Sequence, residues 1–156
     1  MWGKIDEKTL DFALNGGSFI EGYQSPSSYP ADKLPDGSVI SKPGYAFAGW
    51  YDNKEFSGEA VTKIDTSYTG PLVLYAKWTP REYSVTLDAV GGTNGGTVTA
   101  EYDADMPVIA LPVKKGCTFL GYFTQQNGVG DKYYNADGTS ARKYDKTDGL
   151  MLYAGW

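Results

Sequence analysis

The sequence predicts a mostly β protein of the α+β class, built as two small domains in tandem. The first observation is composition: the 156 residues include 20 Gly and 8 Pro, and the longest stretch free of both runs only from Lys4 to Asn15. Gly and Pro are unfavourable inside helices, so a bundle of long helices is excluded. The second observation is that short sequence blocks recur in the same order in the two halves, which indicates a repeated unit.

Three short blocks carry the repetition. Matched blocks mark a shared core, and the unequal lengths between them indicate insertions in surface loops. We therefore predict one repeat over residues 9–78, a second over residues 79–156, and in residues 1–8 the remnant of a preceding repeat that ends at Trp2. The blocks are Asn-Gly-Gly at 15–17 and Val-Gly-Gly at 90–92; Gly-Tyr-Ala-Phe-Ala-Gly-Trp-Tyr at 44–51 and Gly-Cys-Thr-Phe-Leu-Gly-Tyr-Phe at 116–123; and Tyr-Ala-Lys-Trp at 75–78 and Tyr-Ala-Gly-Trp at 153–156.

Alternation of apolar and polar residues with a period of two predicts the strands. Between the third and last strands of the first repeat, residues 59–69 are expected to hold a short helix or a 3₁₀ turn. Along residues 45–51, strict alternation places Phe47 on the face opposite to Trp50. The expected strands are residues 9–14, 47–51 and 71–78 in the first repeat, and 83–88, 96–102, 119–123 and 150–156 in the second.

The aromatic residues at matched positions are expected to form the core of each unit. A domain of about 70 residues encloses little volume, so rings that bury about 150–250 Å² each are needed to stabilise it. Cys117, which occupies the position of Tyr45, is interpreted as a small buried apolar residue. The matched pairs are Phe47 with Phe119, Trp50 with Tyr122, Tyr51 with Phe123, Tyr75 with Tyr153, and Trp78 with Trp156.

An alternating strand ending in Asn-Gly-Gly, then Gly-Tyr-x-Phe-x-Gly-Trp-Tyr, then Leu-Tyr-Ala-Lys-Trp resembles the Listeria–Bacteroides repeat, which is related to the B-repeat of internalin B. The first repeat matches this pattern throughout, whereas the second departs from it at Val90, Cys117, Tyr122 and Gly155. The resemblance implies two tandem β-grasp (ubiquitin-like) domains. It also implies a bacterial cell-surface or secreted protein, in which the repeats act as a stalk or spacer and as a protein-interaction or adhesion module without catalysis. The secretion signal peptide and the cell-surface anchor are then expected outside this sequence.

Composition excludes several functional classes. The chain has no His and one Cys, so His-based catalysis, thiolate zinc clusters and an intramolecular disulfide are excluded, and no cofactor or metal is expected. The net charge of −5 leaves no basic stripe for a nucleic acid. No apolar run reaches the roughly 18–20 residues that cross a bilayer, so direct membrane insertion by this segment is not expected. We expect a monomer whose partner is a protein or a glycan.

Acidic residues beside glycines raise the alternative of calcium binding. Residues 135–138 read Asn-Ala-Asp-Gly and residues 145–149 read Asp-Lys-Thr-Asp-Gly. Neither follows the twelve-residue EF-hand pattern, and Asp or Asn before Gly is common in turns. We therefore favour turns. The pair Asp103 and Asp105 lies on one face of an extended segment, but no cleft or partner for acid–base catalysis can be named.

Tyrosines in segments that differ between the repeats are the candidate interaction surface. Exposed Tyr rings in loops are suited to bind a protein or to stack on sugar rings. This leaves open a second function, a carbohydrate-binding module appended to a secreted glycan-active protein. We favour a structural explanation over either binding role, in which these rings cover the edges of each small core. The residues are Tyr29, Tyr68, Tyr133, Tyr134 and Tyr144.

Overall fold

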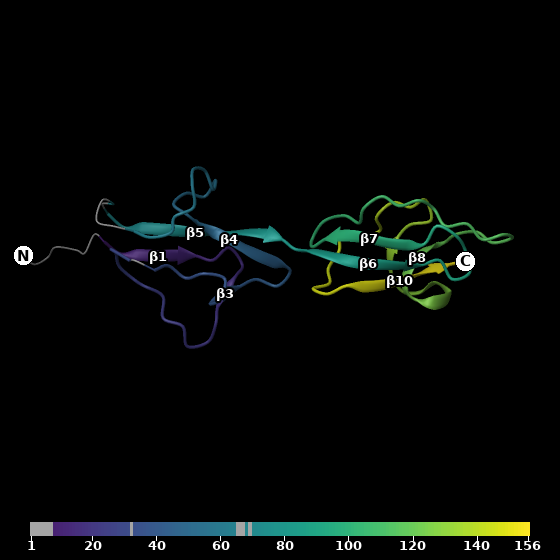
Figure 1. The fold of residues 1–156 in the computed structure, drawn as a ribbon, viewed down its shortest axis with the longest axis horizontal. Helices are drawn as coiled ribbons and strands as arrows, with labels where there is room; N and C mark the ends of the chain where they lie inside the picture. The colour runs from purple at the N-terminus through teal and green to yellow at the C-terminus, as the bar shows by residue number, and fades with distance from the viewer. Residues whose placement is uncertain (1–7, 32, 65–67, 69) are drawn as a thin grey trace, which may run out of the picture. The chain divides into compact units, whose positions relative to one another are not determined.

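The computed structural model describes residues 8–31, 33–64, 68 and 70–156. Contacts between Cα atoms divide the chain into two compact units, Met1–Thr79 and Pro80–Trp156, and Figure 1 shows the strands of each. The expected remnant of a preceding repeat at residues 1–8, with Trp2, lies outside the described residues except for Lys8. We describe each unit by itself.

Unit 1 holds a three-stranded sheet in the order β1-β5-β4. Strands β1 (Leu10–Ala13) and β5 (Leu72–Pro80) pair in parallel, and β4 (Tyr45–Tyr51) lies on the other side of β5. A separate antiparallel pair is formed by β2 (Ser18–Phe19) and β3 (Ile40–Ser41). The first and last strands of the unit therefore lie side by side.

Unit 2 holds a five-stranded sheet in the order β7-β6-β10-β8-β9. The central strands β6 and β10 pair in parallel, and the other neighbours are antiparallel. A short 3₁₀ turn, η1 (Gln126–Gly128), connects β8 to β9. The strands are β6 (Glu82–Asp88), β7 (Gly96–Glu101), β8 (Gly121–Gln125), β9 (Val129–Tyr134) and β10 (Leu150–Gly155).

The parallel pairs of the two units have the same register. Leu10 lies opposite Leu72 in unit 1, and Val85 lies opposite Leu150 in unit 2. Leu10 and Val85 stand at the same distance before the second glycine of their Gly-Gly blocks, and Leu72 and Leu150 at the same distance before the tryptophan that ends each repeat. The matched blocks therefore place the same strands side by side in both halves.

Each unit has its own hydrophobic core. The core of unit 1 is centred on Trp50, Leu74 and Ile64, and that of unit 2 on Tyr122, Leu152 and three further tyrosines. The expectation of a mostly β chain is confirmed. No α-helix occurs among residues 8–31, 33–64, 68 and 70–156. In the segment expected to hold a short helix, Val61 and Ile64 instead form isolated β-bridges, while residues 65–67 and 69 lie outside the described part.

The expected alternation along β4 is wrong at Gly49. Gly49 has a φ of 123°, which interrupts the regular extended backbone, and Gly121 has a φ of 129° at the matched position. The ring of Phe47 therefore packs against Trp50, with centroids 5.2 Å apart, instead of lying on the opposite face. Phe119 and Tyr122 are also 5.2 Å apart. The glycine of the Phe-x-Gly-Trp block thus lets two rings enter one core.

Candidate functional site

The tyrosines proposed as an interaction surface are mostly core residues. Tyr133, Tyr134 and Tyr144 have no exposed surface and Tyr29 retains 3%, so a partner cannot reach these rings. The ring of Tyr68 is half-buried and lies 6.1 Å from that of Tyr29. The hypothesis of an exposed tyrosine surface is therefore corrected, because burying these rings is what closes the two small cores.

Three of these tyrosines direct their hydroxyl groups to acceptors in unit 2. Tyr133 donates to Oδ1 of Asp145 at 2.5 Å, Tyr134 donates to the carbonyl of Pro107 at 2.6 Å, and Tyr144 donates to the carbonyl of Asp148. Burial raises the pKa of all three phenols, that of Tyr144 to about 12. Protonated phenols are needed here because each hydroxyl acts as a donor.

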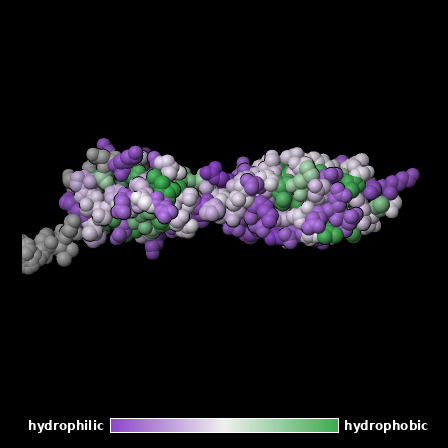
Figure 2. All heavy atoms as spheres, turned by 90° about the horizontal axis from the view of Figure 1, so that it is seen from below, coloured by the Kyte–Doolittle hydropathy of each residue, from purple (hydrophilic) through white to green (hydrophobic). Residues whose placement is uncertain are grey.

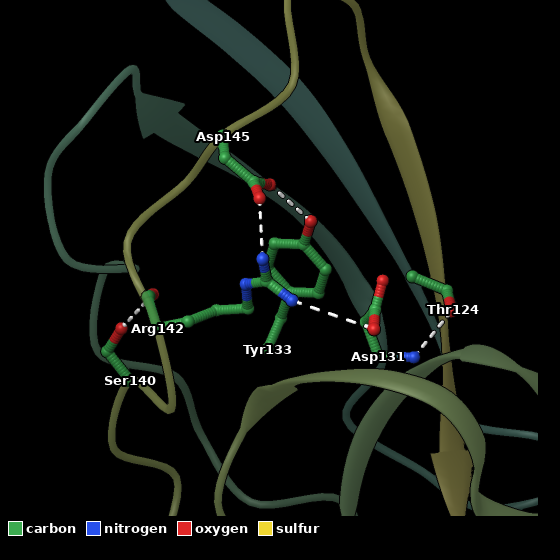
Figure 3. Close-up of polar contacts among 6 residues, drawn as sticks. All are labelled: Thr124, Asp131, Tyr133, Ser140, Arg142 and Asp145. Carbon is green, nitrogen blue, oxygen red and sulfur yellow. Dashed lines mark hydrogen bonds and ion pairs between the residues drawn. The ribbon is translucent and has the colours of Figure 1, made fainter.

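The polar cluster around Tyr133 in Figure 3 is a closed network. Arg142 stacks on the Tyr133 ring at 4.8 Å and donates to Oδ2 of Asp145 at 2.6 Å, and it lies 3.8 Å from Asp131. Partial burial would raise the pKa of Asp145, but the hydrogen bond from Tyr133 and the charge of Arg142 outweigh it and hold the pKa below its usual value. Because each group already has a partner within the cluster, its role is to anchor residues 131–145 to the core.

The first segment considered for calcium binding, residues 135–138, contains a turn. Asp137 Oδ1 accepts hydrogen bonds from the backbone N–H and the hydroxyl of Thr139, at 3.0 and 2.5 Å. This arrangement is an ordinary Asx turn. No group of three or more acidic, His or Cys side chains suited to a metal ion occurs among the described residues. Cys117 is exposed, so its interpretation as a buried apolar residue is wrong.

The candidate binding site is a groove of about 450 Å³ in unit 1. Pockets for small ligands have this size, and they combine apolar walls with a few polar groups. Its walls come from the turn after β1, the turn before β4, the loop after β4, and two strands, β4 and β5. The unit 1 groove is lined by Asn15, Lys42, Tyr45, Lys54, Phe56, Tyr75, Ala76 and Trp78.

The turn after β1 fixes one wall of this groove. Asn15 has a φ of 50° and its side-chain amide donates to the carbonyl of Ala76 at 2.8 Å, which ties the turn to β5. Lys42 donates to the carbonyl of Asn15 at 3.0 Å, and its ammonium lies 4.3 Å from the centre of the Tyr45 ring. These contacts hold the Lys42 ammonium and the Tyr45 ring at defined positions.

The opposite wall is the loop after β4. Asn53 closes this loop by accepting hydrogen bonds from the backbone N–H and hydroxyl of Ser57. Phe56, with a φ of 57°, packs its ring edge-on against Tyr51 at 5.6 Å. Lys54 is exposed and makes no hydrogen bond or ion pair to a described residue. The groove therefore presents rings and one uncommitted ammonium group.

Sequence reasoning missed this groove because it assigned the matched rings to the core. Tyr75 and Trp78 are only half-buried, so part of each ring is open to solvent. The signal was present in the divergence of the second repeat, where Val90 replaces Asn15 and Cys117 replaces Tyr45. A ring that the first repeat has and the second repeat lacks is not required to pack a core that both repeats share.

Comparison with known proteins agrees with the repeat structure. The pattern of the Listeria-Bacteroides repeat domain matches residues 9–77 and again residues 83–154. A putative membrane protein of Evansella cellulosilytica is 29% identical over 98% of this chain and 21% of its own length. Internalin H of Listeria monocytogenes is 31% identical over 76% of this chain and 21% of its own length. A putative Gly-rich membrane protein of Evansella cellulosilytica is 30% identical over 79% of this chain and 14% of its own length.

The chain thus spans about a fifth or less of the length of these relatives. No solved structure matches it. Within the described residues, no helix has the length and apolar character needed to cross a bilayer. The resemblance noted from the motifs is confirmed by the two matches. The chain belongs to the Listeria-Bacteroides repeat family and carries the repeat twice in tandem.

Proposed function

We propose that this chain is a non-enzymatic repeat segment of a longer bacterial surface protein, where it serves as a spacer and as a protein-interaction or adhesion module. The observation that carries the proposal is the double match to a repeat family shared with a relative named internalin and with relatives named membrane proteins. The titratable cluster around Tyr133 supports a structural role, since its carboxylate and guanidinium are paired with each other.

We also propose that each unit is a β-grasp-like domain. The sheet order β7-β6-β10-β8-β9, with the first and last strands parallel at the centre, supports this for unit 2. In unit 1 the parallel pair β1 and β5 supports the same arrangement. Short interproton distances between Leu10 and Leu72, and between Val85 and Leu150, are expected by NMR. Their absence would contradict the proposal.

The surface location can be tested on cells that produce the protein. Antibodies raised against this chain are expected to label intact cells, and brief protease treatment of intact cells is expected to remove the label. A cytoplasmic protein serves as the control that must remain protected. Labelling that requires permeabilised cells would contradict the surface proposal, whatever the chain binds.

The alternative of a carbohydrate-binding module rests on exposed tyrosine rings, but four of the five candidates are buried and the fifth, Tyr68, is half-buried. A different observation now favours glycan binding, namely the rings that line the unit 1 groove. Aromatic faces beside polar groups are suited to sugars because they stack on the apolar faces of the sugar while the polar groups bind its hydroxyls.

A further inference from the structure

We propose that the unit 1 groove binds an acidic glycan, with the sugar ring against the aromatic walls and its carboxylate at Lys54 and Lys42. This inference rests on the proposed function, since it names the ligand class of the surface interaction module. It requires three features: ring faces that a ligand can reach, a local positive charge, and a backbone that is not available for a peptide strand.

Ring faces are available because the groove-lining aromatics are only partly buried. Tyr45, Phe56, Tyr75 and Trp78 are all half-buried, and they approach the groove from β4, from β5 and from the loop after β4. In the core of unit 1, by contrast, Trp50 is 2% exposed and Tyr29 is 3% exposed. Strands β4 and β5 thus supply rings to both the core and the groove, and Trp78 packs against the core while part of its surface stays exposed.

The groove is positive although the protein is acidic. Among the described residues that line it, Lys42 and Lys54 are the charged ones, whereas the whole chain carries −5. Lys42 is held by the carbonyl of Asn15 at 3.0 Å, so its ammonium needs no further ordering to meet an anion. Lys54 has no partner among the described residues and can reorient toward a carboxylate. Charge complementarity therefore favours an anionic ligand over a neutral sugar.

Two backbone contacts argue against an added peptide strand. A peptide that extends a sheet needs free N–H and C=O groups along the edge strand. At the start of β4 the N–H of Tyr45 donates to the carbonyl of Lys42, and near its end the carbonyl of Trp50 accepts from the N–H of Val61. Both ends of the β4 edge are therefore occupied by the chain itself, and the groove offers side chains instead.

The second repeat provides an internal comparison. It keeps the counterparts of Lys42, Tyr75 and Trp78, but Cys117 replaces the Tyr45 ring and Val90 replaces the Asn15 amide. Lys114 reaches the carbonyl of Val90 at 3.2 Å, so the scaffold of the groove persists. The structure thus points to one acidic-glycan site per chain, in unit 1.

Titration calorimetry of the whole chain with a short oligogalacturonate tests this site. The fully methyl-esterified oligosaccharide keeps the sugar rings and removes the charge, so it is expected to bind about tenfold more weakly. Lys54→Gln is expected to weaken binding of the acid form about fivefold and to leave binding of the ester unchanged. Phe56→Ala is expected to weaken both about tenfold. The matched control is Lys63→Gln, an exposed lysine of unit 1 outside the groove, which should change neither.

Three results would overturn the inference. Equal affinity for the acid and the ester would remove the role of the lysines. Equal binding of a short poly-glutamate peptide, with the same dependence on Lys54 and Phe56, would make the ligand a peptide. Absence of oligogalacturonate binding in a chain that retains native stability would reject the site, while surface labelling of cells would still stand. Loss of surface labelling would instead reject the proposed function.

Discussion

Gly17 lies against the indole ring of Trp78, so closely that a Cβ on Gly17 would stand 2.3 Å from Cζ2 of that ring. A Cβ on Gly92 would stand 2.7 Å from the same atom of Trp156. Trp78 also donates to the carbonyl of Leu14 at 2.8 Å, and Trp156 to that of Ala89 at 2.9 Å. In each repeat, the second glycine of the Gly-Gly block therefore packs directly against the tryptophan that ends the repeat.

We expect Gly17→Ala and Gly92→Ala to destabilise their own units by about 1–3 kcal/mol, because the methyl group must displace an indole held by a hydrogen bond. Amide hydrogen exchange in β5 and in β10 reports the two units separately. Gly37→Ala is the control, since the nearest atom to its Cβ is 4.0 Å away. An effect of Gly37→Ala as large as that of Gly17→Ala would contradict the steric explanation.

Tyr122→Phe is expected to leave the stability of unit 2 unchanged or to raise it. The Tyr122 hydroxyl is buried and has no hydrogen-bond partner among the described residues, and burial raises its pKa. Removing an unpaired buried hydroxyl relieves a desolvation cost. Chemical denaturation of the variant provides the measurement, and a loss of stability would show that this hydroxyl has a partner.

Tyr134→Phe is the matched opposite case, with an expected loss of about 1 kcal/mol. In unit 1, Trp50 donates to the carbonyl of Pro35 at 2.7 Å, and in unit 2 Tyr134 donates to the carbonyl of Pro107 at 2.6 Å. The two prolines stand at the same distance before the glycine that opens each long block. In unit 2, Tyr134 thus donates to the carbonyl that corresponds to the one bonded by Trp50 in unit 1. If Tyr134→Phe leaves the free energy of unfolding unchanged, the hydrogen bond from Tyr134 does not stabilise unit 2 and the prediction is wrong.

Val90→Asn is expected to stabilise unit 2 by about 1 kcal/mol, because Val90 has a φ of 48° and β-branched residues are strained there. At the matched position Asn15 has a φ of 50° and donates to Ala76. Ala154 occupies the place of Ala76 in the closing block, so an asparagine at position 90 gains an acceptor. Asn15→Val should weaken unit 1. Thermal denaturation of the Val90→Asn and Asn15→Val variants tests this prediction. A lower melting temperature for Val90→Asn than for the wild type would contradict it.

Unit 2 is expected to lose stability as the pH rises from 10 to 12. The Tyr144 phenol has its pKa raised by burial from 10.0 to about 12, so the unfolded chain releases its proton first. A raised folded-state pKa gives stability that is complete below pH 10 and declines until the folded-state pKa is reached. Denaturation midpoints measured across this range should fall less steeply in Tyr144→Phe. An identical slope would show that folding does not raise the pKa of Tyr144.

At acid pH, protonation of Asp145 is expected to contribute to a loss of stability. Its pKa is held below 3.8 in the folded protein, so its contribution to stability is present above that pH and declines as the pH falls below it. Asp145→Asn should lower stability at neutral pH and flatten the acid side of the stability curve. Comparison with the wild-type curve isolates this residue, and parallel curves would place the acid sensitivity elsewhere.

Hydrophobic surface is spread over the described residues in small patches, as Figure 2 shows in green on the face it draws. Val108 is 92% exposed and Val113 is 60% exposed. The first repeat has Asp36 and Ser41 at the matched positions, so these two exposed apolar side chains belong to the second repeat alone. Sequence comparison of the two repeats identifies such differences, but it does not say which face they occupy.

The repeat pattern by itself determined that the chain is rich in β-strands and that it carries the same unit twice. Those blocks suffice because local alternation predicts strands and glycines mark the turns between them, whereas the pairing of the strands came from the tertiary structure. Only the tertiary structure decided that Phe47 and Trp50 enter one core, that Tyr133, Tyr134 and Tyr144 are buried, and that Cys117 is exposed. Burial depends on residues distant in sequence that close over a ring, and the spacing of the motifs does not contain that information.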